Sequence, residues 1–394
     1  MPAQVFLRKH IQNRIGYFHP WVYANEIGQT EGEVSPGAIV DVFSHLGSFV
    51  GQGFFNPYAS VRIKMFSFKN KVDFNEAYLK GLIERALKYR KELGYGDFFR
   101  LFNSDGDGMP GLIIDHFPTL IVFQTISLGI DYYKDLLVKV LSDLFPDKDI
   151  FEQNEVFVRN LEGLRLQRVV HRGEDVEDLK KGYPYEMLEA QFKLWPGLHD
   201  KTGVDWENMP IWTTIKPFVK EGPFLNLFSG MGELSVLAKL SKAKECVAVD
   251  YNAQQIQLSK EQEKLNGVSD ISWIHQNVFD YLKTSSYKIY QWQAVVVNPP
   301  ALIHKKEQLH KAYAAYKEML IRLLPQIRTN GVILVSFPHH LYESSWVFEL
   351  MHEVMRDVKL QLRLLKELST RWDHPNPASF LQNRAFKAYL WQVN

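Results

Sequence analysis

The sequence predicts an α/β protein: a doubly wound domain with a mostly parallel sheet, preceded by a small β-barrel-like domain and an α+β middle domain. Three observations predict this class. Residues 1–72 hold short β-rich runs between glycine turns, residues 73–185 mix helical and strand patterns, and residues 186–394 alternate strands with helices. No internal repeat or low-complexity tract breaks this order, so the three ranges are the predicted domains.

Composition limits the classes of protein and of partner. With 394 residues and 46% apolar content, the chain is long enough for several domains that each bury a core. The net charge of +1 means that any binding of nucleic acid depends on local basic patches. Three segments are candidates, although each pattern is also typical of a solvated face: 8–14, 159–172 and 304–311.

The single cysteine, Cys246, excludes an internal disulfide and a cysteine-rich zinc site, which fits a reducing compartment. The amino-terminal residues lack the charged start and apolar stretch of an export signal, and no apolar run reaches the about 18 residues of a membrane span. These observations predict a cytoplasmic protein without a membrane segment, and the sequence indicates no metal site.

Local patterns place the elements of the first two domains. β-rich runs that end at glycine or proline turns predict strands, and charged segments with helical periodicity predict helices. The expected strands are 37–44, 47–56, 59–68, 111–117 and 119–126, and the expected helices are 75–95 and 132–145.

The strongest chemical signal is the segment 224–240, where a short apolar strand runs into Ser229-Gly230-Met231-Gly232 and a helix follows at once. Such a turn lets a ligand touch bare backbone at the carboxyl end of a strand, but Gly-x-Gly alone is a weak signal. About 20 residues later, at the spacing of dinucleotide sites, another apolar strand ends at Asp250. Its carboxylate suits the hydroxyl pair of a ribose, although the same residue could simply cap a helix.

Two further strand ends complete the pattern. Asn277 follows the third strand and, with the apolar pair Val278-Phe279, could contact an adenine. The fourth strand stops at Asn298-Pro299-Pro300, because proline cannot extend a sheet. A carboxamide beside free carbonyls suits a flat amino group, although an isolated Asn-Pro-Pro is more often only a strand terminator. Together the four strand ends indicate a class I S-adenosylmethionine-dependent methyltransferase.

Along nearly its whole length the sequence also resembles the PUA-containing ribosomal RNA methyltransferases related to the large-subunit rRNA cytosine-5 enzymes. The segments that carry the resemblance are HPWVY at 19–23, GAIVDVFSHLGSFVGQGFFNPYAS at 37–60, NSDGDGMPGLIIDHF at 103–117, DKTGVDW at 200–206 and DHP at 373–375. The resemblance implies an RNA-binding PUA-like β domain, a carboxyl-terminal Rossmann-like methyltransferase domain, S-adenosylmethionine as cofactor and ribosomal RNA as partner.

Strand ends and resemblance together define the candidate site. The candidate cofactor-binding residues are Lys201, Thr202, Phe228, Ser229, Gly230, Gly232, Asp250, Tyr251, Asn277, Val278 and Asn298. The candidate catalytic residues are Asn298, Pro299 and Pro300, and no metal ligand is expected.

The sequence departs from the family pattern where the chemistry takes place. The resemblance implies that members acting on cytosine C5 use a cysteine to attack C6, and the corresponding position here falls at about Pro338. Asn298 replaces an aspartate of the family, and VDWENM at 204–209 replaces its Phe-Leu-Asp-Gln-Arg run. Cys246 stands at the start of the Asp250 strand, so it is badly placed to substitute.

We therefore expect methyl transfer to a base nitrogen, with Asn298-Pro299-Pro300 fixing the plane of the base, because such transfer needs no covalent enzyme intermediate. Phe337 or Tyr316 could stack on that base, but core packing is the simpler interpretation of both. His339 and His340 are expected in a solvent-facing loop. Two alternatives stay open: an RNA-binding protein that has lost catalysis, and a methyltransferase of a substrate other than RNA. An exposed β-domain edge would allow a homodimer.

Overall fold

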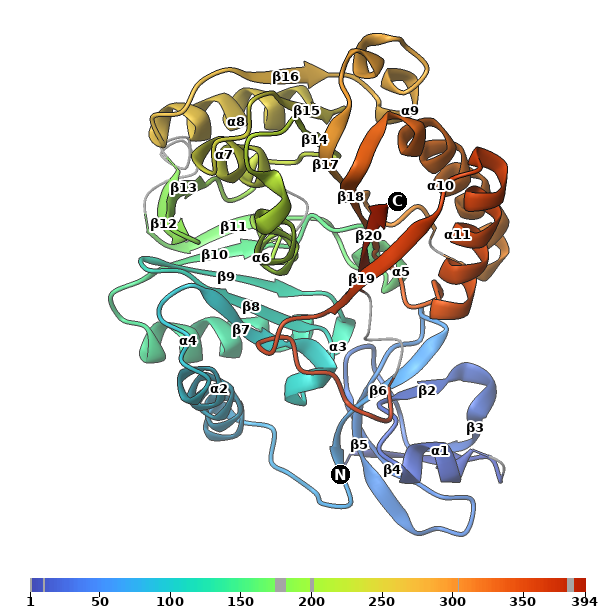
Figure 1. Cartoon of the computed structure of the whole chain (residues 1–394). Helices are drawn as coiled ribbons and strands as arrows, with labels where there is room; N and C mark the ends of the chain where they lie inside the picture. The colour runs from blue at the N-terminus through green and yellow to red at the C-terminus, as the bar shows by residue number, and fades with distance from the viewer. Residues whose placement is uncertain (1, 10, 174–181, 199–201, 304, 381–385) are drawn as a thin grey trace. The chain divides into compact units, whose positions relative to one another are not determined.

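The computed structural model describes residues 2–9, 11–173, 182–198, 202–303, 305–380 and 386–394. The chain forms two compact units, and each contains segments that are distant in sequence (Figure 1). The first unit is Met1–Tyr185 with Leu194–Val204 and Trp372–Asn383, and the second is Glu186–Lys193, Asp205–Arg371 and Arg384–Asn394. The division into three domains stays a prediction. Among the described residues, no helix is long and apolar enough to cross a membrane.

A six-stranded sheet in the order β2-β6-β5-β4-β1-β3 fills the amino-terminal part of the first unit. The alternation of its strands buries Val40 and Val42 on one face with Ile63 and Met65. The three strands expected here are confirmed as β4, β5 and β6. The elements are β1 (Ala3–Leu7), α1 (Gln12–Gly16), β2 (Trp21–Tyr23), β3 (Ile27–Glu31), β4 (Ile39–Phe43), β5 (Phe49–Phe55) and β6 (Val61–Phe68).

A five-stranded sheet in the order β11-β10-β9-β8-β7 forms the rest of the first unit, with α2 and α4 packed on it. Helix α2 begins after Asn75, whose side chain accepts a hydrogen bond from the Tyr78 N–H at 3.0 Å. The elements are α2 (Glu76–Glu92), β7 (Phe99–Asn103), β8 (Leu112–His116), β9 (Leu120–Thr125), α3 (Leu128–Tyr132), α4 (Lys134–Leu144), β10 (Asp149–Gln153), α5 (Val158–Leu161) and β11 (Arg168–Arg172).

The two sheets of the first unit share a hydrophobic core. Phe54 and Phe66, from β5 and β6, are buried in the same cluster as Leu79 and Ile83 of α2. Burial of aromatic rings between the two parts stabilises their association. The predicted ranges 1–72 and 73–185 therefore pack as one compact unit.

A buried carboxylate links three elements of the first unit. Glu152 of β10 is fully buried and accepts hydrogen bonds from Lys134 at 3.1 Å, His171 at 2.9 Å and Gln167 at 2.5 Å. Burial alone would raise the pKa of Glu152, but the hydrogen bonds from His171, Gln167 and Lys134 together lower it from 4.5 to about 2. The carboxylate therefore stabilises the folded state wherever it is ionised.

This pKa predicts a pH-dependent stability. Because the folded pKa of Glu152 is depressed, its contribution of about 3 kcal/mol is complete above pH 4.5 and is lost as the pH falls towards 2. We expect Glu152→Gln to lower the free energy of unfolding at neutral pH, and the difference from the parent to shrink below pH 4.5. Urea unfolding of both proteins across this range measures it. A difference that does not change with pH would contradict the assignment.

The second unit contains a seven-stranded sheet in the order β16-β15-β14-β17-β18-β20-β19, in which β20 runs antiparallel to both neighbours. The hairpin of β12 (Tyr183–Met187) and β13 (Ala190–Leu194) precedes it. The remaining elements are α6 (Asn208–Val219), β14 (Phe224–Leu227), α7 (Glu233–Leu240), β15 (Cys246–Asp250), α8 (Ala253–Leu265), β16 (Ile271–His275), α9 (Val278–Tyr281), β17 (Trp292–Val297), α10 (Leu309–Leu323), β18 (Ile327–Phe337), α11 (Ser344–Val358), β19 (Leu362–Ser369) and β20 (Lys387–Val393).

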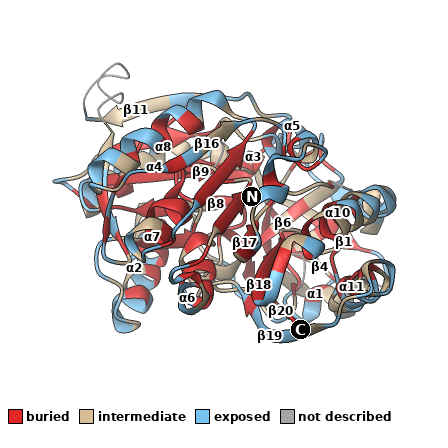
Figure 2. Ribbon diagram, turned by 45° about the horizontal axis from the view of Figure 1, so that its top comes forward, coloured by how far each residue is buried: buried red, intermediate tan, exposed pale blue. Residues whose placement is uncertain are grey.

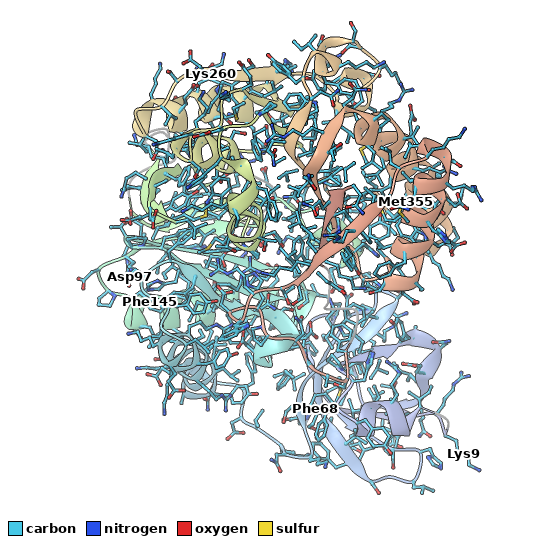
Figure 3. The ribbon with its side chains drawn as sticks, in the orientation of Figure 1. Lys9, Phe68, Asp97, Phe145, Lys260 and Met355 are labelled. Carbon is cyan, nitrogen blue, oxygen red and sulfur yellow. The ribbon has the colours of Figure 1, made fainter. Side chains whose placement is uncertain are left out.

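Helices cover both faces of this sheet, as expected for a doubly wound fold. Leu225, Leu227, Val295 and Val297 pack into one cluster with α9, α10 and α11, while α6, α7 and α8 lie against the other face. Figure 2 shows β17 and β18 largely in the colour of buried residues, and Figure 3 labels Lys260 on α8 and Met355 on α11. Burial on both faces explains why β14, β15 and β17 are continuous apolar runs.

The order of the strands reverses at β14. From β14 the chain adds β15 and then β16 on one side, and it returns to add β17 on the other side. In open α/β sheets, ligands bind at the carboxyl ends of the strands beside such a switch point. The residues that follow β14 and β17 are therefore the expected place for a ligand.

Candidate functional site

The turn after β14 has a left-handed backbone at three positions: Phe228 (φ 60°), Gly230 (φ 55°) and Gly232 (φ 83°). A Cβ added at Gly230 would meet no atom within 4 Å, so this side of the turn is open. A Cβ at Gly232 would lie 2.5 Å from the Trp273 ring and 2.8 Å from the Ser259 hydroxyl. Gly232 therefore permits close packing at the start of α7, and Gly230 leaves room for a ligand.

Asp250 holds this turn from the end of the neighbouring strand. Its Oδ2 accepts a hydrogen bond from the Gly230 N–H at 2.9 Å, and its Oδ1 accepts one from the Asn252 N–H at 2.9 Å. The cap of α8 is Asn252, whose side chain accepts from the N–H groups of Gln254 and Gln255. Asp250 thus faces the glycine turn, while the next residue, Tyr251, is 66% exposed.

Ser229 provides a test of whether a ligand fits this turn. Its hydroxyl is buried and has no hydrogen-bond partner among the described residues. A buried polar atom without a partner costs free energy, and a polar ligand group would supply the missing bond. The open side of Gly230 and the unpaired Ser229 hydroxyl both fit a polar cofactor that touches the backbone here.

The third strand ends at Asn277, a polar residue that caps the following helix. Asn277 is exposed, and its side-chain oxygen accepts a hydrogen bond from the Phe279 N–H at 2.9 Å, which caps α9. Val278 is buried in the core, and the Phe279 ring meets the Phe228 ring edge to face with centroids 6.3 Å apart. An exposed carboxamide at a strand end, close in the chain to one ring of an aromatic pair, suits a flat ring such as the expected adenine.

Asn298 lies at the end of β17, beside the glycine turn: its N–H donates to the Leu227 carbonyl at 3.3 Å. Its Oδ1 accepts a hydrogen bond from the Ser336 hydroxyl at 2.5 Å, and its Nδ2 donates to Asp205 at 3.4 Å. Pro299 is buried and Pro300 is exposed. The carboxamide is therefore held in one orientation by two neighbours.

Sequence patterns did not single out these two neighbours. Asp205 was only one letter of the DKTGVDW segment, and Ser336 one position of an apolar strand. Ser336 was detectable in principle, because it is a polar residue within the buried run 331–337 of β18. Its partner, 38 residues away, could not be read from local sequence.

The position and burial of Cys246 show that it does not replace the nucleophilic cysteine of the family. Pro338, where the resemblance places that cysteine, directly follows the last residue of β18. Cys246 is the first residue of β15, about 13 Å along the strand from Asp250 at the other end. Its thiol is buried, contacts the Ser235 carbonyl oxygen at 3.6 Å, and burial raises its pKa to about 12. Such a thiol is not a nucleophile.

Other predicted residues lie away from the glycine turn or in the core. Tyr316 and Phe337 are fully buried, with ring centroids 4.7 Å apart, so their interpretation as core residues is confirmed. Thr202 belongs to the first unit, where its hydroxyl donates to Asp115. Lys201 lies outside the described residues.

The two loop histidines form no metal site in the described part of the chain. His339 and His340 are half-buried and stack with centroids 4.5 Å apart, and burial lowers the pKa of His340. No group of three or more His, Cys, Asp or Glu side chains in the described ranges could hold a metal ion.

One residue of the predicted basic segments does not lie on the surface. Arg159 is buried and pairs with Asp131 at 2.9 Å, so it contributes no surface charge.

Comparison with known proteins defines the class. Residues 5–68 match the model of a PUA-like domain, and residues 189–363 match that of the methyltransferase small domain. The chain therefore contains a PUA-like domain and a methyltransferase small domain, and the fold expected for a class I S-adenosylmethionine-dependent methyltransferase is confirmed.

Two curated relatives align with the whole chain. Over 400 residues it is 24% identical to ribosomal RNA large subunit methyltransferase I of Shigella flexneri serotype 5b and 25% identical to the protein of that name from Enterobacter sp. strain 638. In both cases 100% of each chain is covered.

Solved structures show the same fold. A protein from Streptococcus mutans described as an S-adenosylmethionine-dependent methyltransferase has a TM-score of 0.83 at 16% identity, with 100% of both chains covered. A methyltransferase solved with SAH has the same score and coverage at 17% identity.

Proposed function

We propose that this protein methylates a base nitrogen in ribosomal RNA of the large subunit. The substrate class is supported by the names of the full-length relatives and by the PUA-like domain. The acceptor atom is inferred from the site: a fixed carboxamide stands at the switch point, and the only thiol is buried at the other end of its strand. Attack on cytosine C6 would need a thiolate beside the base.

The residues of the chain would position both reactants. S-adenosylmethionine supplies a methyl group on a positively charged sulfur, which a lone pair on nitrogen can accept directly. Asp250 would accept hydrogen bonds from ribose hydroxyls, and Ser229 would pair with a polar group of the cofactor. Asn298, with Pro299 and Pro300, would fix the plane of a base that is unpaired or flipped out. Such positioning contributes several kcal/mol of catalysis.

Asp205 has a place in this proposal. Its carboxylate is hydrogen-bonded to the Asn298 carboxamide at 3.4 Å. An exocyclic amine loses one proton when its nitrogen gains a methyl group, and a carboxylate beside the orienting carboxamide can accept that proton. A ring nitrogen such as guanine N7 loses no proton, so for that acceptor Asp205 only orients Asn298.

Methylation of ribosomal RNA from cells that lack the gene tests the proposal directly. We expect purified protein and S-adenosylmethionine to restore one modified nucleotide, with the methyl group on nitrogen when the nucleoside is identified by mass spectrometry. A methyl group on cytosine C5, or a covalent complex with RNA containing a fluorinated cytosine, would overturn the nitrogen assignment.

The buried thiol gives a separate prediction. Cys246→Ala should retain methyl transfer within about twofold of the parent, because Cys246 lies at the amino-terminal end of β15, and should lose only some stability to a small cavity. Transfer rates and unfolding midpoints of both proteins measure this. Loss of activity in a folded Cys246→Ala protein would show that the thiol takes part.

Two further expectations belong to this proposal. A protein that acts on ribosomal RNA would work in the cytoplasm. A homodimer could form through β3, the edge strand of the six-stranded sheet, which is mostly exposed. Sedimentation of the parent over a range of concentrations tests the dimer, and a monomer at every concentration would contradict it.

A further inference from the structure

The first unit contains a pocket of 710 Å³ that belongs to neither the glycine turn nor Asn298. All of its walls come from this unit: Phe18 and Pro20, β6, α2, the loop at 105–110 and the segment 375–379. Phe68, labelled in Figure 3, is part of the β6 wall. Sites for small organic ligands are of about this size, between roughly 300 and 1,000 Å³.

Two aromatic rings of this pocket are exposed although the structure holds them in place. Phe18 is 48% exposed and Tyr89 is 40% exposed. The Phe18 carbonyl accepts a hydrogen bond from the Ser379 hydroxyl at 2.9 Å, and its ring meets that of Phe68 at 5.5 Å. The Tyr89 hydroxyl donates to the Trp372 carbonyl at 3.2 Å. Exposed rings with fixed positions suit stacking on a flat ligand.

Cationic groups accompany these rings. Arg85 lies on the exposed side of α2 and lines the pocket. The Lys69 ammonium lies 4.9 Å from the centre of the Phe18 ring. Cations beside exposed aromatic rings are the usual combination for single-stranded nucleic acid, because they neutralise phosphates while the rings stack on bases.

Asp105 adds an acidic group to the wall of the pocket. It lines the pocket, and its Oδ2 accepts a hydrogen bond from the Ser104 hydroxyl at 3.0 Å. Its Oδ1 makes no hydrogen bond of normal geometry among the described residues, although the Trp21 side chain interacts with this carboxyl. Burial raises the pKa of this carboxyl, while Ser104 and Lys64 oppose the rise. Because Asp105 lines the pocket, rotation of its side chain would present an oxygen to a donor there.

We propose that this pocket binds one unpaired nucleotide of the RNA substrate, with its base against Phe18 and Tyr89, its phosphate near Arg85 and Lys69, and a base N–H directed to Asp105. This inference rests on the proposed function, because it takes the substrate to be RNA. It adds a second base-binding site, built by the unit that contains the PUA-like domain. Guanine, with adjacent N1–H and N2–H donors, matches a carboxylate acceptor best.

Binding of labelled single-stranded RNAs, each rich in one base, tests the pocket. We expect Phe18→Leu and Arg85→Gln to weaken binding on the order of tenfold, and Arg85→Gln also to reduce the salt dependence of the affinity. Lys88→Gln is the matched control, because it removes a charge from α2 outside the pocket and should change affinity by less than about twofold. Asp105→Asn should reduce the preference for guanine-containing RNA.

Photo-crosslinking gives a second readout. RNA carrying thiolated bases should crosslink to peptides that contain Phe18 or Tyr89, and Phe18→Leu should suppress the product. SAH affinity, which depends on the second unit, should be unchanged in every variant, and thermal unfolding followed by circular dichroism should show that the first unit of each variant is folded. If the pocket variants bind RNA like Lys88→Gln, the inference is wrong. It is also wrong if Phe18→Leu alters sedimentation instead, because a second copy of the chain would then occupy the pocket.

The two proposals can fail separately. RNA methylation by the parent together with unaffected binding by the pocket variants would overturn the pocket and leave the proposed function intact. Weakened binding by these variants without any RNA methylation would support the pocket and overturn the proposed function. A parent protein that binds no RNA would overturn both.

Discussion

Asn298→Ala is expected to lower the rate of methyl transfer on the order of a hundredfold or more while SAH affinity changes by less than about twofold. Asn298 is held by Ser336 and Asp205 at the end of β17, and the proposed function assigns it to the orientation of the base and not of the sulfur of the cofactor. Single-turnover methylation of RNA and calorimetric titration with SAH measure the two quantities on the same protein.

Two control variants make this result interpretable. Gln293→Ala removes a carboxamide from the other end of β17 and should leave the rate unchanged. Ser336→Ala keeps Asn298 but removes the hydrogen bond to its Oδ1, so it should cause an intermediate loss of rate. If Asn298→Ala transferred methyl groups at the parent rate, Asn-Pro-Pro would be only a strand terminator.

Asp250→Ala is expected to weaken the binding of SAH by about 1–3 kcal/mol, or roughly 5- to 150-fold, and methyl transfer at limiting cofactor should fall in parallel. The substitution leaves two ribose hydroxyls poorly paired. It also removes the acceptor of the hydrogen bonds that the Gly230 N–H and the Asn252 N–H donate in the parent protein. The glycine turn would therefore lose the contact that fixes it.

The control for charge is Asp280→Ala, an exposed acid of α9 that pairs with Lys283 at 3.0 Å. Its loss should change SAH affinity by less than about twofold, because a surface ion pair is worth little. Calorimetric titration compares the two variants. Equal SAH affinity of Asp250→Ala and the parent would remove Asp250 from the cofactor site.

Local patterns predicted the strand ends of the second unit because each signal lies within a few residues. The apolar run Phe224–Leu227 followed by Gly230 and Gly232 specifies a strand, a turn and a helix without any distant contact. Asp250 followed the same logic. The sequence order of four such ends therefore sufficed for the fold class, and it predicts a site at the carboxyl ends of these strands.

Distant contacts could not be read in this way. Asp205 and Ser336 reach Asn298 across 93 and 38 residues, so no window of local sequence contains both partners. The insertion of β20 between β18 and β19 has the same cause, because strand pairing is decided by packing across the sheet. The burial of Phe54 with α2 is a further distant contact, and it packs together the ranges 1–72 and 73–185, which the local strand and helix patterns divide.

The return of residues 372–383 to the first unit bears on the order in which a growing chain can fold. Arg90 is fully buried and donates to the Asp373 carbonyl at 2.7 Å, and the Arg100 N–H donates to the Asp373 carboxylate at 3.0 Å. Amino-terminal domains usually fold first during translation. Here, however, Arg90 and Arg100 lack this acceptor until nearly the whole second unit has been synthesised. Strand β20, which pairs with β18 and β19, follows this segment a few residues later in the sequence. A chain interrupted between 371 and 372 would consequently leave both units unfinished at once.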